Sequence, residues 1–463
     1  MLDCSLVRDV LKAALSTGGD FAEIFVEDRY STRLRMVGGD LETAISGRDY
    51  GIGIRIFQKL NYVYAFTNDP SRENLLQVAR TAAQALPGAA GSIVLDLTRL
   101  ELPNRHPIKI LPESVNKCQK VDLMTRAYRT AKDYDAQVSQ VSIDYLDDDQ
   151  KVLIANSEGL DVEDRRVRTR TMIQAIAAKG TEKQVGFYGP GASMGFEFYE
   201  TINIEDYARE AARIAVTMIN AELCPTGKMP VIIDNEFGGV IFHEACGHSL
   251  EATSVAKGAS VFSGKLGEQV ASEIVTAIDD GTIPNAWGSQ NVDDEGRPMR
   301  RNILIENGIL KSYMIDAFNA RRMQMEPTAN ARRQNYRFAP TSRMTNTFID
   351  SGKSTPEEII ANTEYGLYAK YMGGGSVQPS TGDFNFAVNE GYLIKNGKID
   401  RPVRGATLIG NGAEILKRID MVGNNLAHGQ GMCGSMSGAC PANVGQPMIR
   451  VAEILVGGQK GGQ

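Results

Sequence analysis

Two histidines and a glutamate near the middle of the chain form the stretch whose residue types most clearly indicate chemistry. Glu244 directly follows His243, and His248 stands five residues after His243, so half of the four histidines lie beside one carboxylate. Neutral imidazoles are good ligands of Zn²⁺, and a glutamate that does not bind the metal can take a proton from the attacking water. The pattern predicts a zinc site with hydrolytic chemistry.

The spacing of the two histidines sets a condition on the local backbone. In the H-E-x-x-H pattern the histidines stand four residues apart on one helical face, whereas His243 and His248 are five apart. Five residues of regular α-helix turn the second side chain by about 140° from the first. The histidines therefore converge only if the helix contains a π-bulge or unwinds, which Gly247 would permit. A buried helix with two ordinary histidines is the alternative.

A third metal ligand has to come from another part of the chain, because catalytic zinc usually has three protein ligands. His428 and Cys433 are candidates, since both lie in a glycine-rich segment that lets the backbone approach a metal closely. Thiolate is a good zinc ligand. His106 is expected to be an exposed loop histidine, and Cys246 a buried small residue that points elsewhere.

Composition and charge limit the class of protein. At 463 residues, with 42% hydrophobic and 23% charged residues, the chain is expected to form two globular domains. A net charge of −6 argues against nucleic acid as a partner. The short basic runs at 165–170 and 332–333 are interpreted as solvated faces, and the acidic run at 293–296 as a turn rather than a calcium loop.

The sequence also carries expectations about location. The first residues include an early acid and no unbroken apolar core, so they do not resemble a signal peptide. No apolar run is long enough to cross a bilayer. The six cysteines are scattered and expected to be reduced. We therefore expect a cytoplasmic protein with no membrane partner.

The order of helix and strand signals predicts an α+β protein. The first half alternates between the two kinds of signal, which favours a domain of mostly antiparallel sheet with long helices on one side, over residues 1–223. The expected helices include 6–15, 112–134 and 204–223, and the expected strands include 21–26, 31–37, 51–57, 138–146 and 151–156, with a turn at 147–149.

The second half is richer in glycine and in short β-type runs. Turn signals at 306–308 and 395–398 are typical of hairpins. They predict a β-rich, barrel-like domain over residues 224–463, in which a helix near 238–252 carries the histidines.

Taken together, these motifs resemble the TldD/PmbA family of zinc metallopeptidases, and specifically its TldD, catalytic branch. The resemblance covers nearly the whole chain and is densest in the second half. The segments that carry it are 156–159, 225–228, 243–251, 293–296, 305–308, 343–347, 405–410 and 431–434.

The resemblance implies a Zn²⁺ ion held by His243, His248 and Cys433, with Glu244 as the catalytic general base. It implies hydrolysis of unfolded proteins or short peptides and a heterodimer with a paralogous non-catalytic subunit; a homodimer is the alternative. The chain departs from the family after the cysteine, where C-G-K-x-G-Q is usual and this chain has C-G-S-M-S-G at 433–438. The missing lysine bears on substrate preference more than on metal binding.

Two non-enzymatic roles remain open from the sequence. One is a regulatory binding protein, since members of the family are also described as modulators of DNA gyrase. The other is a non-catalytic subunit of a TldD/PmbA-type complex. The acidic balance of the chain argues against direct DNA contact, and the retained metal residues favour the catalytic member.

Overall fold

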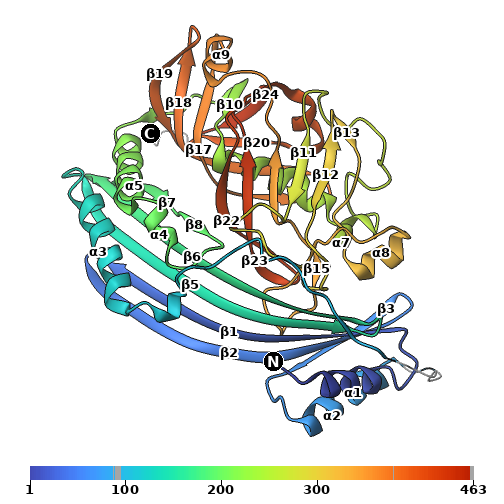
Figure 1. Cartoon of the computed structure of the whole chain (residues 1–463). Helices are drawn as coiled ribbons and strands as arrows, with labels where there is room; N and C mark the ends of the chain where they lie inside the picture. Colours follow the sequence, from blue (N-terminus) through green and yellow to red (C-terminus); the bar gives the residue numbers. More distant parts are fainter. Residues whose placement is uncertain (87, 89–94, 379, 459–463) are drawn as a thin grey trace.

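The first half of the chain forms one long, curved, mostly antiparallel sheet in the computed structural model, which describes residues 1–86, 88, 95–378 and 380–458. The strand order is β3-β2-β1-β5-β6-β4, and β7 and β8 also pair with β6. Figure 1 shows this sheet curving around the second half of the molecule. Its strands are β1 (Phe21–Val37), β2 (Asp40–Gln58), β3 (Asn61–Thr67), β4 (Thr98–Arg99), β5 (Val138–Asn156), β6 (Leu160–Lys179), β7 (Glu182–Tyr188) and β8 (Gly191–Ala192).

The strands of this sheet are longer than the sequence predicted. β1 is continuous where two strands were expected, and β5 runs through Asp147–Asp149 where a turn was expected. The predicted turn is wrong because each of these aspartates has a cationic partner, so the carboxylates do not force the chain out of the sheet. The ion pairs are Lys120–Asp147 (2.6 Å), Arg29–Asp148 (2.7 Å) and Arg165–Asp149 (2.6 Å).

Two pairs of helices pack against opposite ends of the sheet (Figure 1). At one end, α1 (Cys4–Ala14) and α2 (Arg72–Gln84) bury apolar residues such as Leu11 and Leu75 against the sheet. At the other end, α3 (Lys117–Lys132) and α5 (Ile204–Ile219) do the same through alanine-rich faces, and the short α4 (Phe198–Thr201) precedes α5. The expected combination of antiparallel sheet and long helices is confirmed.

The second half contains a closed barrel of five strands. Its order is β17-β10-β24-β20-β18, and pairing of β17 with β18 closes the ring, while β19, β9 and β21 extend it. The expected barrel-like domain is confirmed. These strands are β9 (Glu222–Leu223), β10 (Gly227–Ile233), β17 (Tyr365–Gln378), β18 (Asp383–Lys395), β19 (Lys398–Arg404), β20 (Thr407–Asn411), β21 (Ile419–Val422) and β24 (Ile449–Gly457).

A second sheet lies beside the barrel and has the order β13-β12-β11-β16-β23-β22. Its last two strands form a hairpin that places β22 at the edge of the sheet. The strands are β11 (Ala277–Asp280), β12 (Arg301–Glu306), β13 (Ile309–Leu310), β16 (Asn346–Ile349), β22 (Ala427–Ser435) and β23 (Gly438–Gln446), and β14 (Ala331–Arg332) pairs separately with β15 (Thr341–Ser342). The remaining α-helices include α8 (Ala317–Met323), α9 (Pro356–Ala361) and α10 (Gly412–Ile415).

Over the described residues, no helix combines the length and apolar composition that a bilayer crossing requires.

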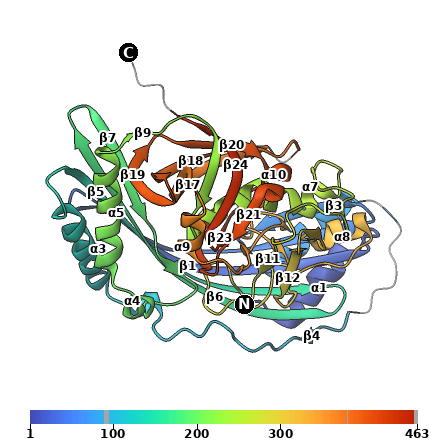
Figure 2. The same cartoon turned by 90° about the horizontal axis from the view of Figure 1, so that it is seen from above.

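Buried ion pairs join the two halves of the molecule, which Figure 2 shows from above. Glu23 on β1 binds Arg55 of β2 at 2.8 Å and Arg333 of the second half at 2.7 Å. Arg55 also binds Glu295 of the second half at 2.7 Å. All four side chains are almost completely buried. A buried charge without a partner is costly, so each half depends on the other to satisfy these groups.

The basic run at 165–170 is not the solvated face that the sequence suggested. Arg166, Arg168 and Arg170 are buried and share one face of β6, because strand side chains alternate. Arg166 binds Asp294 of the second half at 2.6 Å, so the acidic turn at 293–296 is buried as well. The basic pair at 332–333 is likewise buried. The interpretation fails because distant segments cover these side chains: Arg166 binds Asp294, Arg168 donates to the carbonyl oxygen of Trp287, and Arg333 binds Glu23.

We expect Glu23→Gln to lower the free energy of unfolding by ~3 kcal/mol, because the change leaves buried guanidinium groups short of a charged partner. Asp28→Asn is the matched control on the same strand, where Asp28 pairs at 2.6 Å with the exposed Arg48. This pair should contribute less than ~1 kcal/mol. Urea denaturation of both variants measures the difference, and equal small effects would show that the buried pairs do not hold the halves together.

Candidate metal centre

The segment that carries the histidines is an irregular helix. It begins as α6 (Val240–Phe242), passes into a π-helical turn at His243–Gly247 and ends in a 3₁₀ turn at His248–Leu250. A π turn meets the condition that the five-residue spacing sets, because its wider turn brings the two side chains back toward one side. The ring centroids of His243 and His248 are 5.3 Å apart.

Close contacts with neighbouring backbone hold the π turn in place. A Cβ atom at Gly412 would lie 2.1 Å from the carbonyl oxygen of Ala245, so only glycine allows α10 to approach the turn. Gly247 similarly leaves room for the sulfur of Met344, which would lie 2.3 Å from an added Cβ. Cys246 is fully buried and its thiol donates to the carbonyl oxygen of Gly412 at 3.5 Å. Its side chain therefore faces α10, and burial raises the pKa of this thiol.

Cys433 reaches the two histidines from the hairpin of β22 and β23. Its Sγ lies 3.2 Å from Nε2 of His243 and 3.3 Å from Nε2 of His248. The three donor atoms all lie within 4.8 Å of one another. In the part of the chain that the structure describes, this is the one place where three such side chains gather in a way that could hold a metal ion.

The electrostatic state of the cluster favours a thiolate ligand. Burial opposes ionisation of the Cys433 thiol, but the neighbouring His243 and His248 outweigh burial and lower its pKa to about 3. Burial also disfavours a charged His248, yet Glu251 and Cys433 raise the pKa of His248 well above its usual value. Without a metal ion, the thiolate therefore faces a protonated imidazole, and a cation that binds here displaces that proton.

The other two histidines are placed elsewhere. His106 is buried and its Nδ1 accepts a hydrogen bond at 3.0 Å from the backbone N–H of Asn285, so the expected exposed histidine is wrong. No local pattern around His106 indicates that this loop crosses to the second half of the molecule. His428 lies on β22 with Cys433. Its ring packs edge-on against Phe348 with the ring centroids 5.0 Å apart, and burial lowers the pKa of His428. Neither histidine joins the cluster.

Two residues that were not singled out as site residues orient the cluster. Glu251 lies 3.2 Å from Nδ1 of His248, on the side of the ring opposite Cys433. Arg343 is fully buried and donates to the carbonyl oxygens of Cys433 and Gly438, and its Nε lies 3.9 Å from Glu251. The spacing of Glu251, three residues after His248, is a signal that could have identified it; nothing local identifies Arg343.

Glu244 lies beside the cluster without being one of the three converging groups. Its Oε2 is 3.7 Å from Nε2 of His248, and its side chain is 28% exposed. A carboxylate in this position is close to the donor atoms and also reachable by water. It can therefore exchange protons with a group bound next to the cluster.

The donor set fits zinc. One thiolate and two imidazoles are ligands that Zn²⁺ prefers, and three protein ligands leave an open position for water or substrate. The contact between Glu251 and the outer nitrogen of His248 is the arrangement that commonly fixes a metal-binding imidazole. His243 likewise presents its Nε2 to the cluster, and its buried Nδ1 has no hydrogen-bond partner among the described residues.

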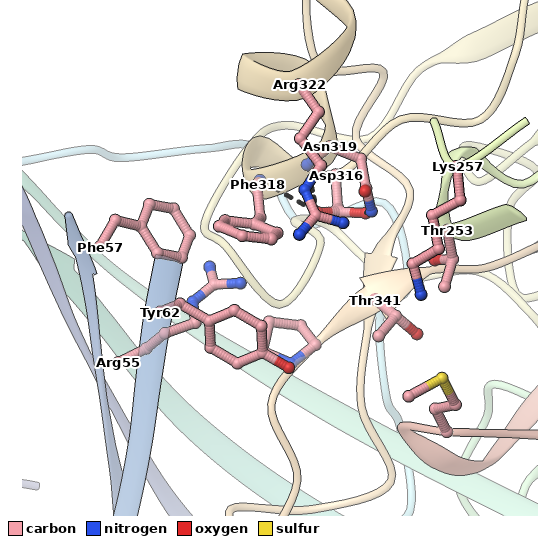
Figure 3. A pocket seen from close by; sticks show the side chains of 12 residues that line it. Arg55, Phe57, Tyr62, Thr253, Lys257, Asp316, Phe318, Asn319, Arg322 and Thr341 are labelled. Atoms are coloured by element: carbon pink, nitrogen blue, oxygen red, sulfur yellow. Dashed lines mark hydrogen bonds between the residues drawn. The ribbon is translucent and has the colours of Figure 1, made fainter. Parts of the chain in front are cut away.

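A pocket of about 130 Å³ lies next to the segments that carry these ligands. It is lined by Thr253 and Lys257, which follow Glu251 in sequence, and by Met436 at the tip of the hairpin of Cys433. Figure 3 shows the aromatic rings of Phe57, Tyr62 and Phe318 across the pocket from Thr253 and Lys257. The pocket thus combines an aromatic wall from both halves with polar groups beside the cluster.

Family models match the chain along most of its length. Residues 22–86 match the model for PmbA/TldA metallopeptidase domain 1, residues 110–219 the central domain and residues 226–458 the C-terminal domain. Two relatives extend the match. A metalloprotease TldD homolog of Haemophilus influenzae is 36% identical and covers 95% of this chain and 93% of its own. A zinc metalloprotease TldD homolog of Saccharolobus solfataricus is 26% identical, and the match covers 97% of this chain and 99% of that protein.

Solved structures share the fold. TldE from Thermococcus kodakarensis superposes with a TM-score of 0.78 at 20% identity, covering 98% of this chain and 100% of that one. A candidate modulator of a DNA gyrase from Thermotoga maritima gives a TM-score of 0.81 at 23% identity, with 98% and 99% coverage. At these identities the structures establish the architecture alone.

We expect Gly412→Ala to displace the π turn and lower the free energy of unfolding by ~1–3 kcal/mol, because the new methyl group would overlap the Ala245 carbonyl. Gly434→Ala is the control beside Cys433, since nothing lies within 4 Å of a Cβ there. It should change stability by less than ~0.5 kcal/mol. Urea denaturation compares the two variants, and wild-type stability in Gly412→Ala would show that the turn does not depend on this contact.

Proposed function

The chain belongs to the PmbA/TldD family of metallopeptidases, and from that premise we propose that it is a zinc-dependent peptidase that hydrolyses short peptides or unfolded proteins. The observation that carries the proposal is the convergence of the Cys433 sulfur on Nε2 of both His243 and His248. A purely regulatory or non-catalytic subunit has no need of such a buried donor set. Zinc analysis of the purified chain separates the two roles.

The three converging residues would hold the zinc ion. When bound, zinc polarises a carbonyl group and lowers the pKa of water toward ~7. Glu251 fixes the orientation of the His248 ring from its outer nitrogen, and Arg343 fixes the backbone of Cys433. These residues position the ligands and do not touch the substrate.

Glu244 is the proposed general base. Its partly exposed carboxylate, 3.7 Å from Nε2 of His248, accepts the proton of the attacking water as that water adds to the peptide carbonyl. The same carboxyl group then gives the proton to the leaving amine as the C–N bond breaks. One residue, Glu244, therefore carries the proton from the attacking water to the leaving amine, which requires a carboxylate that faces both solvent and the cluster.

The pocket in Figure 3 is the proposed site for one substrate side chain. Its aromatic wall favours a large side chain. The exposed Met436 at its rim directly follows Ser435, which stands where the family usually has lysine. An extended peptide can also add to β22, which is an edge strand, through backbone hydrogen bonds that read little sequence.

A related chain is the proposed partner. The solved TldE structure shares this fold, and we propose a heterodimer with such a paralogous subunit, with a homodimer of this chain as the alternative. A mass measurement in solution of the chain alone and mixed with its paralogue distinguishes them. No nucleic acid or membrane takes part in the proposed activity.

We expect Glu244→Gln to keep its zinc but to lose about 10²-fold or more in kcat/KM for peptide hydrolysis, because a general base contributes this much. The assay pairs zinc analysis with digestion of an unstructured peptide, by the chain alone and with its paralogue. Glu273→Gln, an exposed glutamate away from the cluster, is the matched control and should keep full activity. Full peptidase activity in Glu244→Gln would contradict the assigned role.

We expect Cys433→Ala to lose most of its zinc, because only two protein ligands remain. The wild-type chain should hold about one zinc ion per chain after purification, since the described residues contain one such cluster. Metal analysis after dialysis measures both, and thermal denaturation checks that the variant is folded. A folded Cys433→Ala variant with wild-type zinc content would rule out Cys433 as a ligand.

A further inference from the structure

A second chamber lies on the opposite side of the hairpin from the metal centre. It is a cavity of about 420 Å³ between the first-half sheet and the hairpin of β22 and β23. Met432 and Pro441, which pair with each other across the hairpin, line this cavity. Cys433 and Cys440, the next pair, point to the other face, because side chains alternate along strands. The chamber is therefore separate from the site of the proposed peptidase.

The walls of the chamber carry a strong excess of positive charge. Seven arginines and two aspartates line it. The arginines are Arg29, Arg33, Arg166, Arg168, Arg170, Arg332 and Arg333, and the aspartates are Asp148 and Asp294. Arg33 is exposed to solvent. Three of the others have carboxylate partners, in the pairs Arg29–Asp148, Arg166–Asp294 and Arg333–Glu23.

Three arginines of the chamber have no carboxylate within ion-pair distance among the described residues. They are Arg168, Arg170 and Arg332, and each is at most 6% exposed. They donate only to backbone carbonyls. Arg168 donates to Trp287 and Ser289, Arg170 to Gly189 and Gln430, and Arg332 to Met344 and Pro441.

Each of these guanidinium groups keeps donors free for a ligand. A guanidinium has five N–H groups, and no more than two nitrogens of each arginine make the hydrogen bonds to carbonyls. The remaining nitrogens of Arg168, Arg170 and Arg332 are not among the described buried atoms that lack a hydrogen-bond partner, so they stay accessible to solvent. The unused N–H groups therefore open onto the chamber that these residues line.

The charges in the chamber repel one another. Burial, together with the nearby Arg332 and Arg166, lowers the pKa of Arg168 to about 9. Burial lowers the pKa of Arg170 to about 10. Both side chains still carry their proton at neutral pH, so the folded chain holds buried like charges that its own carboxylates do not neutralise. An anion in the chamber would relieve this repulsion.

We propose that the chamber binds a small oxyanion of the phosphate or carboxylate class, with Arg168, Arg170 and Arg332 as its main ligands. Planar guanidinium groups match the oxygen pairs of both classes. The apolar wall, which includes Trp287 under the guanidinium of Arg170 at 5.4 Å, leaves room for an organic part of the ligand.

The position of the anion gives it a structural consequence. Arg168 and Arg170 belong to β6 of the first half, and Arg332 belongs to β14 of the second half. Two of these arginines also hold carbonyl oxygens of the hairpin, at Gln430 and Pro441. A bound anion therefore ties both halves to the hairpin that carries Cys433, and the folded state gains stability by RT ln(1 + [anion]/Kd).

Calorimetric titration of the full chain tests the proposal with inorganic phosphate, sulfate and glutarate, at an ionic strength matched by sodium chloride. We expect saturable binding of phosphate or glutarate at one site per chain. Arg168→Gln and Arg332→Gln should each weaken it at least ~10-fold, because each loses a charge-assisted hydrogen bond. Two controls should bind as the wild type does: Arg401→Gln on the exposed face of β19, and Cys433→Ser, which alters only the proposed metal centre.

Absence of saturable binding of all three anions to the wild-type chain would overturn the proposal. Wild-type affinity in both arginine variants would overturn it as well, and so would binding that is lost in Cys433→Ser but kept in Arg168→Gln. Thermal denaturation of each variant checks folding; if Arg168→Gln does not fold, Arg332→Gln and the wild-type titration decide. A failed zinc assay at Cys433 leaves these outcomes unchanged, so the two proposals fail separately.

Discussion

The imidazole nitrogens of His243 and His248 converge on one sulfur only because the turn between them is π-helical. One additional residue in this turn compensates for a spacing that would direct the two side chains apart in a regular α-helix. A π turn is rarely stable alone, and here α10 packs against its carbonyl through Gly412. The contacts of α10 and of Met344 therefore hold this irregular turn in place.

The hairpin of β22 and β23 supplies the other half of the cluster and is itself held from both faces. On the side of the metal centre, Arg343 donates to the backbone of Cys433 and Gly438. On the opposite side, Arg332 and Arg170 donate to other carbonyls of the hairpin. Because Arg170 comes from the first-half sheet, the position of the third donor atom depends on how the two halves of the molecule pack.

Periodic patterns in the sequence were sufficient for the broad architecture. They predicted the α+β class, the antiparallel first-half sheet and the barrel-like second half, all of which depend on local alternation of apolar and polar residues. The five-residue histidine spacing also predicted an irregular helix. The patterns failed for charged and polar groups whose partners lie more than a hundred residues away, as they do for Arg166, Asp148 and His106. Contacts between distant segments leave no periodic signal, and the roles of Arg343 and the arginine chamber were invisible because both depend on such contacts.

The most direct test of the central claim is an X-ray absorption spectrum of zinc bound to the purified chain. A site made by Cys433, His243 and His248 should give one sulfur neighbour at ~2.3 Å and nitrogen or oxygen neighbours at ~2.0–2.1 Å. The sulfur contribution should disappear in Cys433→Ser. A zinc spectrum without sulfur, or one that keeps sulfur in that variant, would contradict the convergence of these three side chains on one ion.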